Sequence, residues 1–223
     1  MLQKKNRNIL IYFFLFFIFG TLNNKNLINT NFEKWSEINI EGLDDHNNFD
    51  LKKNLEDLKI KNSFLLDKNK INKIILSNNL VEKYSVFKIY PSKLDIKIDK
   101  TEFLARLKRN GEDLFLGSNG KLIKIEEQHD GLPFIFGNFK NENFFELKKV
   151  IDETNFNYSR IEELFFFKLG RWDIKTDTGI IIKLPKYNLK KSLELSIKIL
   201  LEDDKKEINE IDLRQNNQII ING

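Results

Sequence analysis

The hydrophobic pattern begins with an unbroken apolar run, residues 9–19, which is followed by Gly20, Thr21 and Leu22. About 14 helical residues span roughly 21 Å, which is short of the ~30 Å hydrocarbon core of a bilayer. The run has no polar face, however, and about ten strongly apolar residues favour membrane insertion by ~3–6 kcal/mol. A signal-peptide core has a similar length, but no small-residue cleavage site follows this run. We therefore predict an uncleaved transmembrane helix over residues 9–22, after a cytoplasmic tail of residues 1–8.

The excess positive charge of the chain lies before this run. Lys4, Lys5 and Arg7 have no acidic residue among them, and only Lys25 follows closely on the other side. The positive-inside rule therefore predicts a single pass through a membrane, with the N-terminus in the cytoplasm and the bulk of the chain exported. Three of the 37 basic residues belong to the tail, which leaves 34 against 33 acidic residues elsewhere. A nucleic-acid-binding protein concentrates positive charge on its folded part, so nucleic acid is excluded as a partner.

The segment after the apolar run predicts a small α/β module. Residues 23–34 are rich in Asn and Lys and are predicted to form a linker. Residues 35–101 then combine alternating runs with two stretches of helical spacing. The predicted elements are a strand at 36–42, a helix on Leu51, Leu55 and Leu58, a loop at 64–67, a helix on Ile71, Ile74 and Ile75, and strands at 81–90 and 94–98. Two helices on one face of a three-stranded sheet are the natural packing of this order.

From residue 102 to residue 223 the pattern changes to strands and turns. Asn110 and Gly111 form a strong signal for a two-residue hairpin. The predicted strands are 103–109, 113–116, 121–125, 161–169, 171–176, 180–184, 211–214 and 219–221, with a short apolar piece at 131–137 and helices on Phe144, Leu147, Val150 and Ile151 and on Leu189, Leu193, Ile197 and Leu200. The fold class is therefore α+β, with an N-terminal transmembrane helix, a β-α-α-β-β domain and a mostly antiparallel β domain with two helices.

Candidate catalytic groups are few and do not converge. The chain has no cysteine and two histidines, which leaves little material for a thiolate nucleophile or a metal centre. His46, beside Asp44 and Asp45, and His129 are interpreted as solvated side chains. Ser118 is interpreted as part of a hairpin turn, because a nucleophile elbow requires a strand-to-helix turn and a base. We therefore predict no enzymatic activity, no cofactor, no metal and no small-molecule substrate.

The last strand indicates a possible interaction surface. Residues 218–223 form an apolar run next to Asp212, Leu213 and Arg214. A terminal strand often lies at the edge of a sheet, where its unpaired backbone groups can accept a strand from another protein. A nearby arginine can add a charge contact to such a partner. The alternative is an ordinary paired strand that closes the domain.

Several segments, in the same order along the chain, resemble the FtsQ/DivIB family of bitopic cell-division proteins. Asn62 to Asp67 resemble a loop of the polypeptide-transport-associated (POTRA) domain of that family. The remaining segments are V-F-K-I-Y-P-S-K-L-D-I-K-I at 86–98, L-P-F-I-F-G at 132–137, R-W-D-I at 171–174, I-K-L-P at 182–185 and I-D-L-R at 211–214. The resemblance assigns residues 35–101 to an FtsQ-type POTRA domain and residues 102–223 to the family's β domain.

The resemblance implies a non-enzymatic scaffold in the inner membrane at the division septum, with the bulk of the chain in the periplasm. Such a scaffold links early and late cell-division proteins. It implies that the β domain binds FtsB, within an FtsB–FtsL pair, by strand addition, and that septal proteins such as FtsW and FtsI are further partners. Arg214 coincides with an arginine of the family in that contact, whereas Gln215 replaces a frequent aromatic residue. The partner-binding candidates are Arg214, Gln215, Asn217, Gln218, Ile219, Ile220 and Ile221, and the recruitment candidates are Val86 and Lys88.

Two other classes of protein remain as alternatives. A POTRA-containing exported protein of a transport or envelope-assembly system would share the first module. Members with an outer-membrane barrel need many strands of about ten residues, which roughly 120 residues with two helices cannot supply. An exported hydrolase would need converging catalytic groups, which the sequence does not show.

Overall fold

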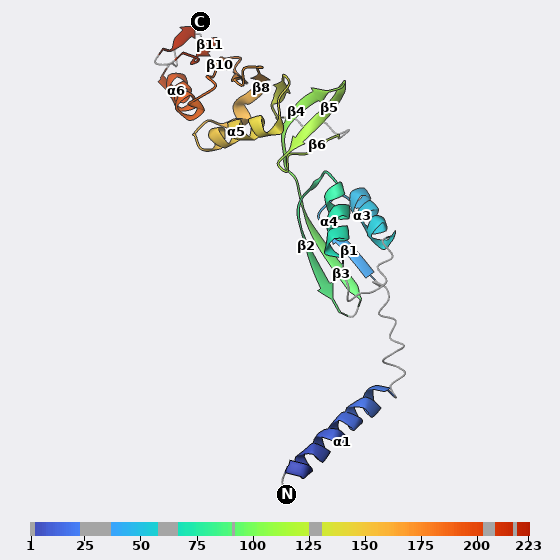
Figure 1. The fold of residues 1–223 in the computed structure, drawn as a ribbon. Helices are drawn as coiled ribbons and strands as arrows, with labels where there is room; N and C mark the ends of the chain where they lie inside the picture. Colours follow the sequence, from blue (N-terminus) through green and yellow to red (C-terminus); the bar gives the residue numbers. More distant parts are fainter. Residues whose placement is uncertain are drawn as a thin grey trace. The chain divides into compact units, whose positions relative to one another are not determined.

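The computed structural model describes residues 3–22, 37–57, 67–90, 92–124, 131–202, 208–215 and 218–223. The chain divides into two compact units. The first unit comprises Met1–Asn78 and Tyr84–Ile98, and the second comprises Asn79–Lys83 and Asp99–Gly223. The predicted linker, residues 23–34, lies outside the described residues. Helices and strands are labelled as in Figure 1.

The first element, α1, is a 20-residue helix, Gln3–Leu22. This helix contains residues 9–22, as predicted, and it begins earlier, so that residues 3–8 of the predicted tail are helical as well. Lys, Arg and Gln are good helix formers, and no glycine or proline separates them from the apolar run. Side chains 9–19 are exposed, apart from the half-buried Ile18. In the described part of the chain, no helix combines the length and the apolar character needed to cross a membrane. The predicted membrane span is therefore not confirmed.

The first unit has the predicted β-α-α-β-β order. Its elements are β1 (Glu37–Glu41), α3 (Asp45–Asp57), α4 (Lys68–Ser77), β2 (Val81–Ile89) and β3 (Lys93–Lys100). The sheet order is β1-β3-β2, and β1 runs parallel to β3 with Ile38 opposite Leu94 and Ile40 opposite Ile96. These alternate positions are buried, as are Leu51, Leu55, Ile71 and Ile75 of the two helices. Figure 1 shows both helices on one face of this sheet.

The ends of the two helices follow local chemistry. Asp67 caps α4, because its side chain accepts hydrogen bonds from the backbone N–H groups of Asn69 and Lys70. The helix predicted on Leu51, Leu55 and Leu58 begins at Asp45 and is described as far as Asp57. Leu58 and most of the predicted loop at 64–67 lie outside the described residues.

The described part of the second unit contains a nine-stranded sheet, two α-helices and a short 3-10 helix, Tyr158–Arg160. The strand order is β12-β11-β10-β9-β8-β7-β4-β5-β6. Five of the described strand pairs are antiparallel and three are parallel, namely β4 with β7, β7 with β8, and β10 with β11. The bounds are β4 (Phe103–Arg109), β5 (Glu112–Gly117), β6 (Leu122–Ile123), β7 (Phe134–Phe136), α5 (Asn141–Asp152), β8 (Ile161–Phe166), β9 (Trp172–Thr176), β10 (Ile181–Lys183), α6 (Leu189–Glu202), β11 (Glu210–Asp212) and β12 (Ile220–Asn222). The predicted mostly antiparallel domain with two helices is therefore confirmed.

The core of the second unit includes a row of buried residues that lie opposite one another on neighbouring strands of this sheet. Neighbouring strands β7, β8, β9, β10 and β11 contribute one buried residue each to a continuous row, namely Ile135, Leu164, Ile174, Ile182 and Ile211. Phe144, Leu147 and Ile151 of α5 and Leu193 of α6 belong to the same core. Both helices therefore cover one face of the sheet.

Turns determine the first hairpin and the point at which β8 ends. Asn110 and Gly111 have φ angles of 54° and 85°, as the predicted two-residue turn between β4 and β5 requires. The strand predicted at 121–125 is described only as Leu122–Ile123, and the strand predicted at 161–169 ends at Phe166. The latter is shorter because residues 167–171 form the turn into β9, with Phe167 N donating to Arg171 O at 3.0 Å.

The Ser118-Asn119 turn holds the first residues of the second unit. The Asn119 side chain donates to the backbone carbonyls of Asn79 and Val81 at 2.8 and 2.9 Å. The Ser118 hydroxyl donates to the Glu82 carboxylate at 2.8 Å. Ser118 is thus part of a hairpin turn, as the sequence predicts, and its hydroxyl has a structural contact.

Replacing Asn119 tests this anchor. Asn119→Ala leaves the Asn79 and Val81 carbonyls without these donors, and we expect the free energy of unfolding to fall by about 1–3 kcal/mol. Urea unfolding followed by circular dichroism measures the change. Asn138→Ala, at an exposed position, is the control and should shift stability by less than about 0.5 kcal/mol. Equal unfolding midpoints for the two variants would contradict the assignment.

Candidate functional site

Strand β12 forms an edge of the large sheet. It pairs antiparallel with β11, with Asp212 opposite Ile220, Ile211 opposite Ile221 and Glu210 opposite Asn222. Among the residues that the structure describes, no second strand pairs with β12, which is the end member of the strand order. One row of its backbone donors and acceptors therefore faces outward, as strand addition requires.

The side chains at this edge are apolar and only half-covered. Ile219, Ile220 and Ile221 are 43%, 44% and 44% exposed. Natural edge strands are usually protected by charged side chains, proline or a bulge. Residues 218–223 contain no charged residue and no proline. This edge therefore lacks the usual protection against a further strand.

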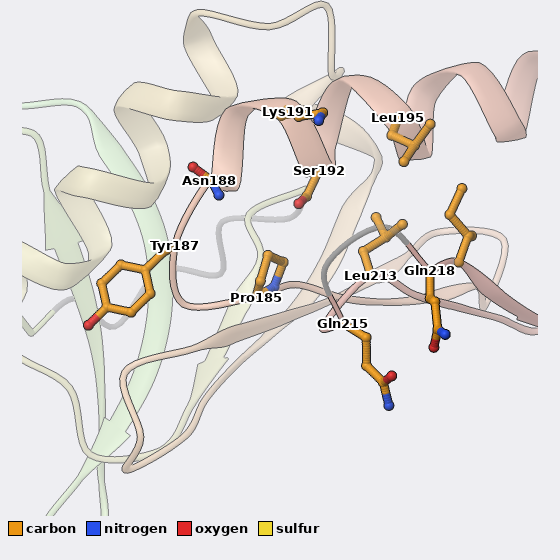
Figure 2. A pocket seen from close by; sticks show the side chains of 10 residues that line it. Pro185, Tyr187, Asn188, Lys191, Ser192, Leu195, Leu213, Gln215 and Gln218 are labelled. Carbon is orange, nitrogen blue, oxygen red and sulfur yellow. The ribbon is translucent and has the colours of Figure 1, made fainter.

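A cavity of about 400 Å³ lies beside β12, between α6 and the segments that flank β11. Figure 2 shows Leu195 of α6 facing Leu213, which follows β11. Gln215 and Gln218 line the same cavity from the connection between β11 and β12. The other lining residues are Pro185, Tyr187, Asn188, Lys191, Ser192 and Ile219. The cavity is therefore on the helix-covered side of the sheet, and Ile219, the residue before β12, is part of its lining.

The side chain of Arg214 is bound within the chain. Its Nε donates to Asp212 Oδ1 at 2.8 Å and to Oδ2 at 3.0 Å, and its Nη2 donates to Oδ2 at 2.5 Å. This guanidinium lowers the pKa of the Asp212 carboxyl, mainly through the side-chain hydrogen bond. The predicted partner-binding arginine thus lies at the edge of the domain, but its fork of donors is directed toward β11.

Asp212 and Arg214 belong to a cluster of charges on the sheet face opposite the helices. Lys183 of β10 is opposite Asp173 of β9 on one side and Asp212 of β11 on the other. Lys183 also forms an ion pair with Glu210. Burial raises the pKa of Asp173, although the charges of Arg171, Arg214 and Lys183 act in the opposite direction. The cluster is balanced in charge and borders the β12 edge.

The recruitment candidates lie in the first unit, on the edge strand β2. The Tyr84 hydroxyl donates to Asn72 of α4 at 2.7 Å, which places Tyr84 on the helix side of the sheet. Strand alternation puts Val86 and Lys88 on that same side. Val86 is half-buried and Lys88 is exposed. The remaining candidate, Asn217, lies outside the described residues.

The histidines that the sequence analysis considered do not form a site with other groups among the described residues. His46 Nε2 lies 3.5 Å from Asp50 Oδ2, and both side chains are exposed. In the ranges that are described, no group of three or more histidine or carboxylate side chains could hold a metal ion. His129 is outside those ranges.

Sequence reasoning missed two parts of the site. One is the wall of the cavity between Pro185 and Leu195, which lies far along the chain from β12 and carries no local motif. The other is Asp212, which the sequence shows two residues before Arg214 but whose role depends on the sheet register. The Asp-x-Arg spacing is the signal that could have suggested this pair, because an Asp side chain can bond to the backbone N–H two residues on.

Comparisons with known proteins match both units. Residues 34–100 match the POTRA domain, FtsQ-type, and residues 105–214 match the C-terminal domain of cell division protein FtsQ/DivIB. A comparison with curated proteins gives no match. A solved structure that matches is the major extracytoplasmic domain of the trans isomer of the cell division protein DivIB from Geobacillus stearothermophilus, with 15% identity and a TM-score of 0.35 over 48% of this chain and 99% of that one. At this TM-score the likeness adds nothing to the family matches, whose last residue precedes β12.

The raised pKa of Asp173 predicts a pH-dependent effect on stability. The folded-state value lies above the unfolded value of about 3.9, so wild type loses stability as the pH rises through the folded-state pKa. Asp173→Asn is neutral throughout, and we expect it to raise the free energy of unfolding at pH 7 but not near pH 3. Urea unfolding at both pH values measures this. Asp177→Asn, at an exposed ion pair with Arg160, is the control, and a loss of stability in Asp173→Asn at pH 7 would contradict the prediction.

Proposed function

The chain belongs to the FtsQ/DivIB family of cell-division proteins, and we propose from this premise that it is a non-enzymatic divisome scaffold that binds a partner strand at β12. The observation that supports the proposal most directly is the free, apolar edge of β12. The proposed partner is FtsB, within an FtsB–FtsL pair. In this role the protein links early cell-division components to later ones, such as FtsW and FtsI, during septum assembly.

Strand addition explains how the site could select its partner. Main-chain hydrogen bonds supply a modest net free energy of about 0.5–1.5 kcal/mol each. They do not distinguish one partner sequence from another, because they involve no side chain. Successive side chains of an added strand point to opposite faces of the sheet. We expect those on the helix side of β12 to enter the cavity that Leu195 and Leu213 line. Burial of one apolar side chain there contributes about 1.5–3 kcal/mol and selects among possible strands.

The rim of the cavity adds polar recognition. Gln215 and Gln218 present amide groups that can donate and accept, and Lys191 brings a positive charge. A partner residue that enters the cavity therefore combines an apolar side chain with polar or acidic neighbours. Gln215 takes the place of the frequent aromatic residue of the family, so recognition at that position is polar in this chain.

The proposed location is the inner membrane at the division septum, with the two units on the extracytoplasmic side. The exposed apolar side chains of α1, from Ile9 to Phe19, support attachment to a membrane. Lys4, Lys5 and Arg7 at the start of the same helix support a cytoplasmic N-terminus.

Removing the edge strand tests the proposal. Deletion of residues 218–223 removes the strand that offers free backbone groups, so we expect capture of FtsB–FtsL from the same species to fall to background. Affinity capture with the full chain in detergent measures the loss. Circular dichroism and thermal unfolding check that the rest of the protein stays folded. Undiminished capture by a folded deletion variant would refute strand addition at β12.

Filling the cavity tests the selection step separately. Ser192→Phe places a large side chain in the cavity while leaving the backbone edge intact, and we expect FtsB affinity to fall by about tenfold or more. The matched control is Lys198→Phe, on an exposed position of the same helix that does not line the cavity. Titration of labelled FtsB measures both affinities. Equal losses for both variants would show that the cavity does not receive the partner.

A further inference from the structure

Asp212 is a buried carboxylate on β11, the strand next to the edge strand β12. It is the last residue of β11 and lies opposite Ile220 of β12. Its side chain is 8% exposed, although a carboxylate is rarely buried without strong partners. The partner that compensates this burial is therefore central to what the residue does.

Both the backbone and the side chain of Arg214 bind this carboxylate. Asp212 Oδ1 accepts from the backbone N–H of Arg214 at 3.0 Å and from Arg214 Nε at 2.8 Å. Oδ2 accepts from Nε and Nη2 of the same arginine. An Asp side chain that accepts the N–H two residues on closes a tight turn. This turn lies where the chain leaves β11 and starts its return toward β12.

A partner strand on β12 cannot reach Asp212 directly. Adjacent strands are about 4.8 Å apart, so an added strand lies roughly 10 Å from the β11 backbone, with β12 between them. Asp212 engages the Nε and Nη2 side of the Arg214 guanidinium, and the arginine side chain is 38% exposed. Asp212 is therefore placed to act on the partner through β12.

Few other interactions hold β12 in place. It is a three-residue strand with one neighbour, and its isoleucines remain about half-exposed. Outside the ladder, Asn209 N donates to Asn222 O at 2.9 Å and Gln218 N donates to Gln215 O at 3.4 Å. The Asn222 side-chain amide also donates to the Glu210 carboxylate of β11 at 3.2 Å. The turn closed by Asp212 is the one charge-assisted contact described at the start of the connection from β11 to β12.

We infer that Asp212 is a positioning residue for strand addition, which orders β12 by holding Arg214 in the turn that follows β11. This inference rests on the proposed function, in that the ordered strand is the docking edge. It assigns Arg214 to the same task, because the bound guanidinium holds the turn that shapes the edge.

A double-mutant cycle with a local readout tests the inference. The variants of the full chain are Asp212→Asn, Arg214→Ala and the combination of both. FtsB affinity is measured for each, together with amide hydrogen exchange in the free protein at residues 220–222 of β12 and 172–176 of β9. The matched controls are Asp177→Asn and Arg160→Ala, which remove an Asp–Arg pair with an Nε–Oδ1 distance of 3.2 Å at the turn that follows β9.

We expect each single variant to weaken FtsB binding by about tenfold, and the double variant to be no weaker than either one. Exchange in β12 should accelerate by a similar factor while β9 keeps its protection. The controls should leave FtsB affinity and β12 exchange unchanged. Wild-type affinity in Asp212→Asn, or weakened binding by Arg214→Ala with unchanged β12 exchange, would overturn the inference. If wild type binds no FtsB, the proposed function fails, and the exchange measurement alone still decides whether Asp212 orders β12.

Discussion

Parallel neighbouring strands cannot be joined by a tight turn, and the second unit is organised around this constraint. β7 runs parallel to β8, and β10 runs parallel to β11, so each pair needs a long crossover. α5 and α6 are these crossovers, and the shared hand of such connections brings both to one face of the sheet. The apolar row from Ile135 to Ile211 is buried under them. The helix layer, the core and the free face of the sheet follow from this connectivity.

The same connectivity creates the candidate site. α6 carries the chain past β10 and back to β11, and β12 then folds antiparallel onto the outside of β11. The outermost strand therefore lies next to the start of α6, and the cavity forms where the helix and the strand diverge. On the opposite face, Asp173, Lys183 and Asp212 follow one another across three neighbouring strands. The edge thus has an apolar recess on one side and a balanced cluster of charges on the other.

Local chemistry made many elements predictable from the sequence. Leu94, Ile96 and Ile98 alternate strictly and form one face of β3, and Asn110 with Gly111 determines the first hairpin. The free edge at the end of the strand order agrees with one of the two outcomes that the sequence left open. Parallel pairing, the cavity and the Asp212–Arg214 contact were not predictable, because they depend on register between segments that are distant in sequence. The start of α1 was missed because positive charges were interpreted through membrane topology, while helix propensity carries the helix back to Gln3.

An edge that recognises a partner through its main chain depends on the order of its own backbone. β12 has three residues and one neighbouring strand, so local opening costs little free energy compared with unfolding of the core. A partner that binds only the paired form of β12 stabilises that form by mass action, and its apparent affinity falls with the fraction of molecules in which β12 is open. Contacts that hold β12 onto β11 therefore enter the binding free energy without touching the partner. For this reason the interior of the last turn, and not only its exposed surface, determines how well the scaffold can engage another strand.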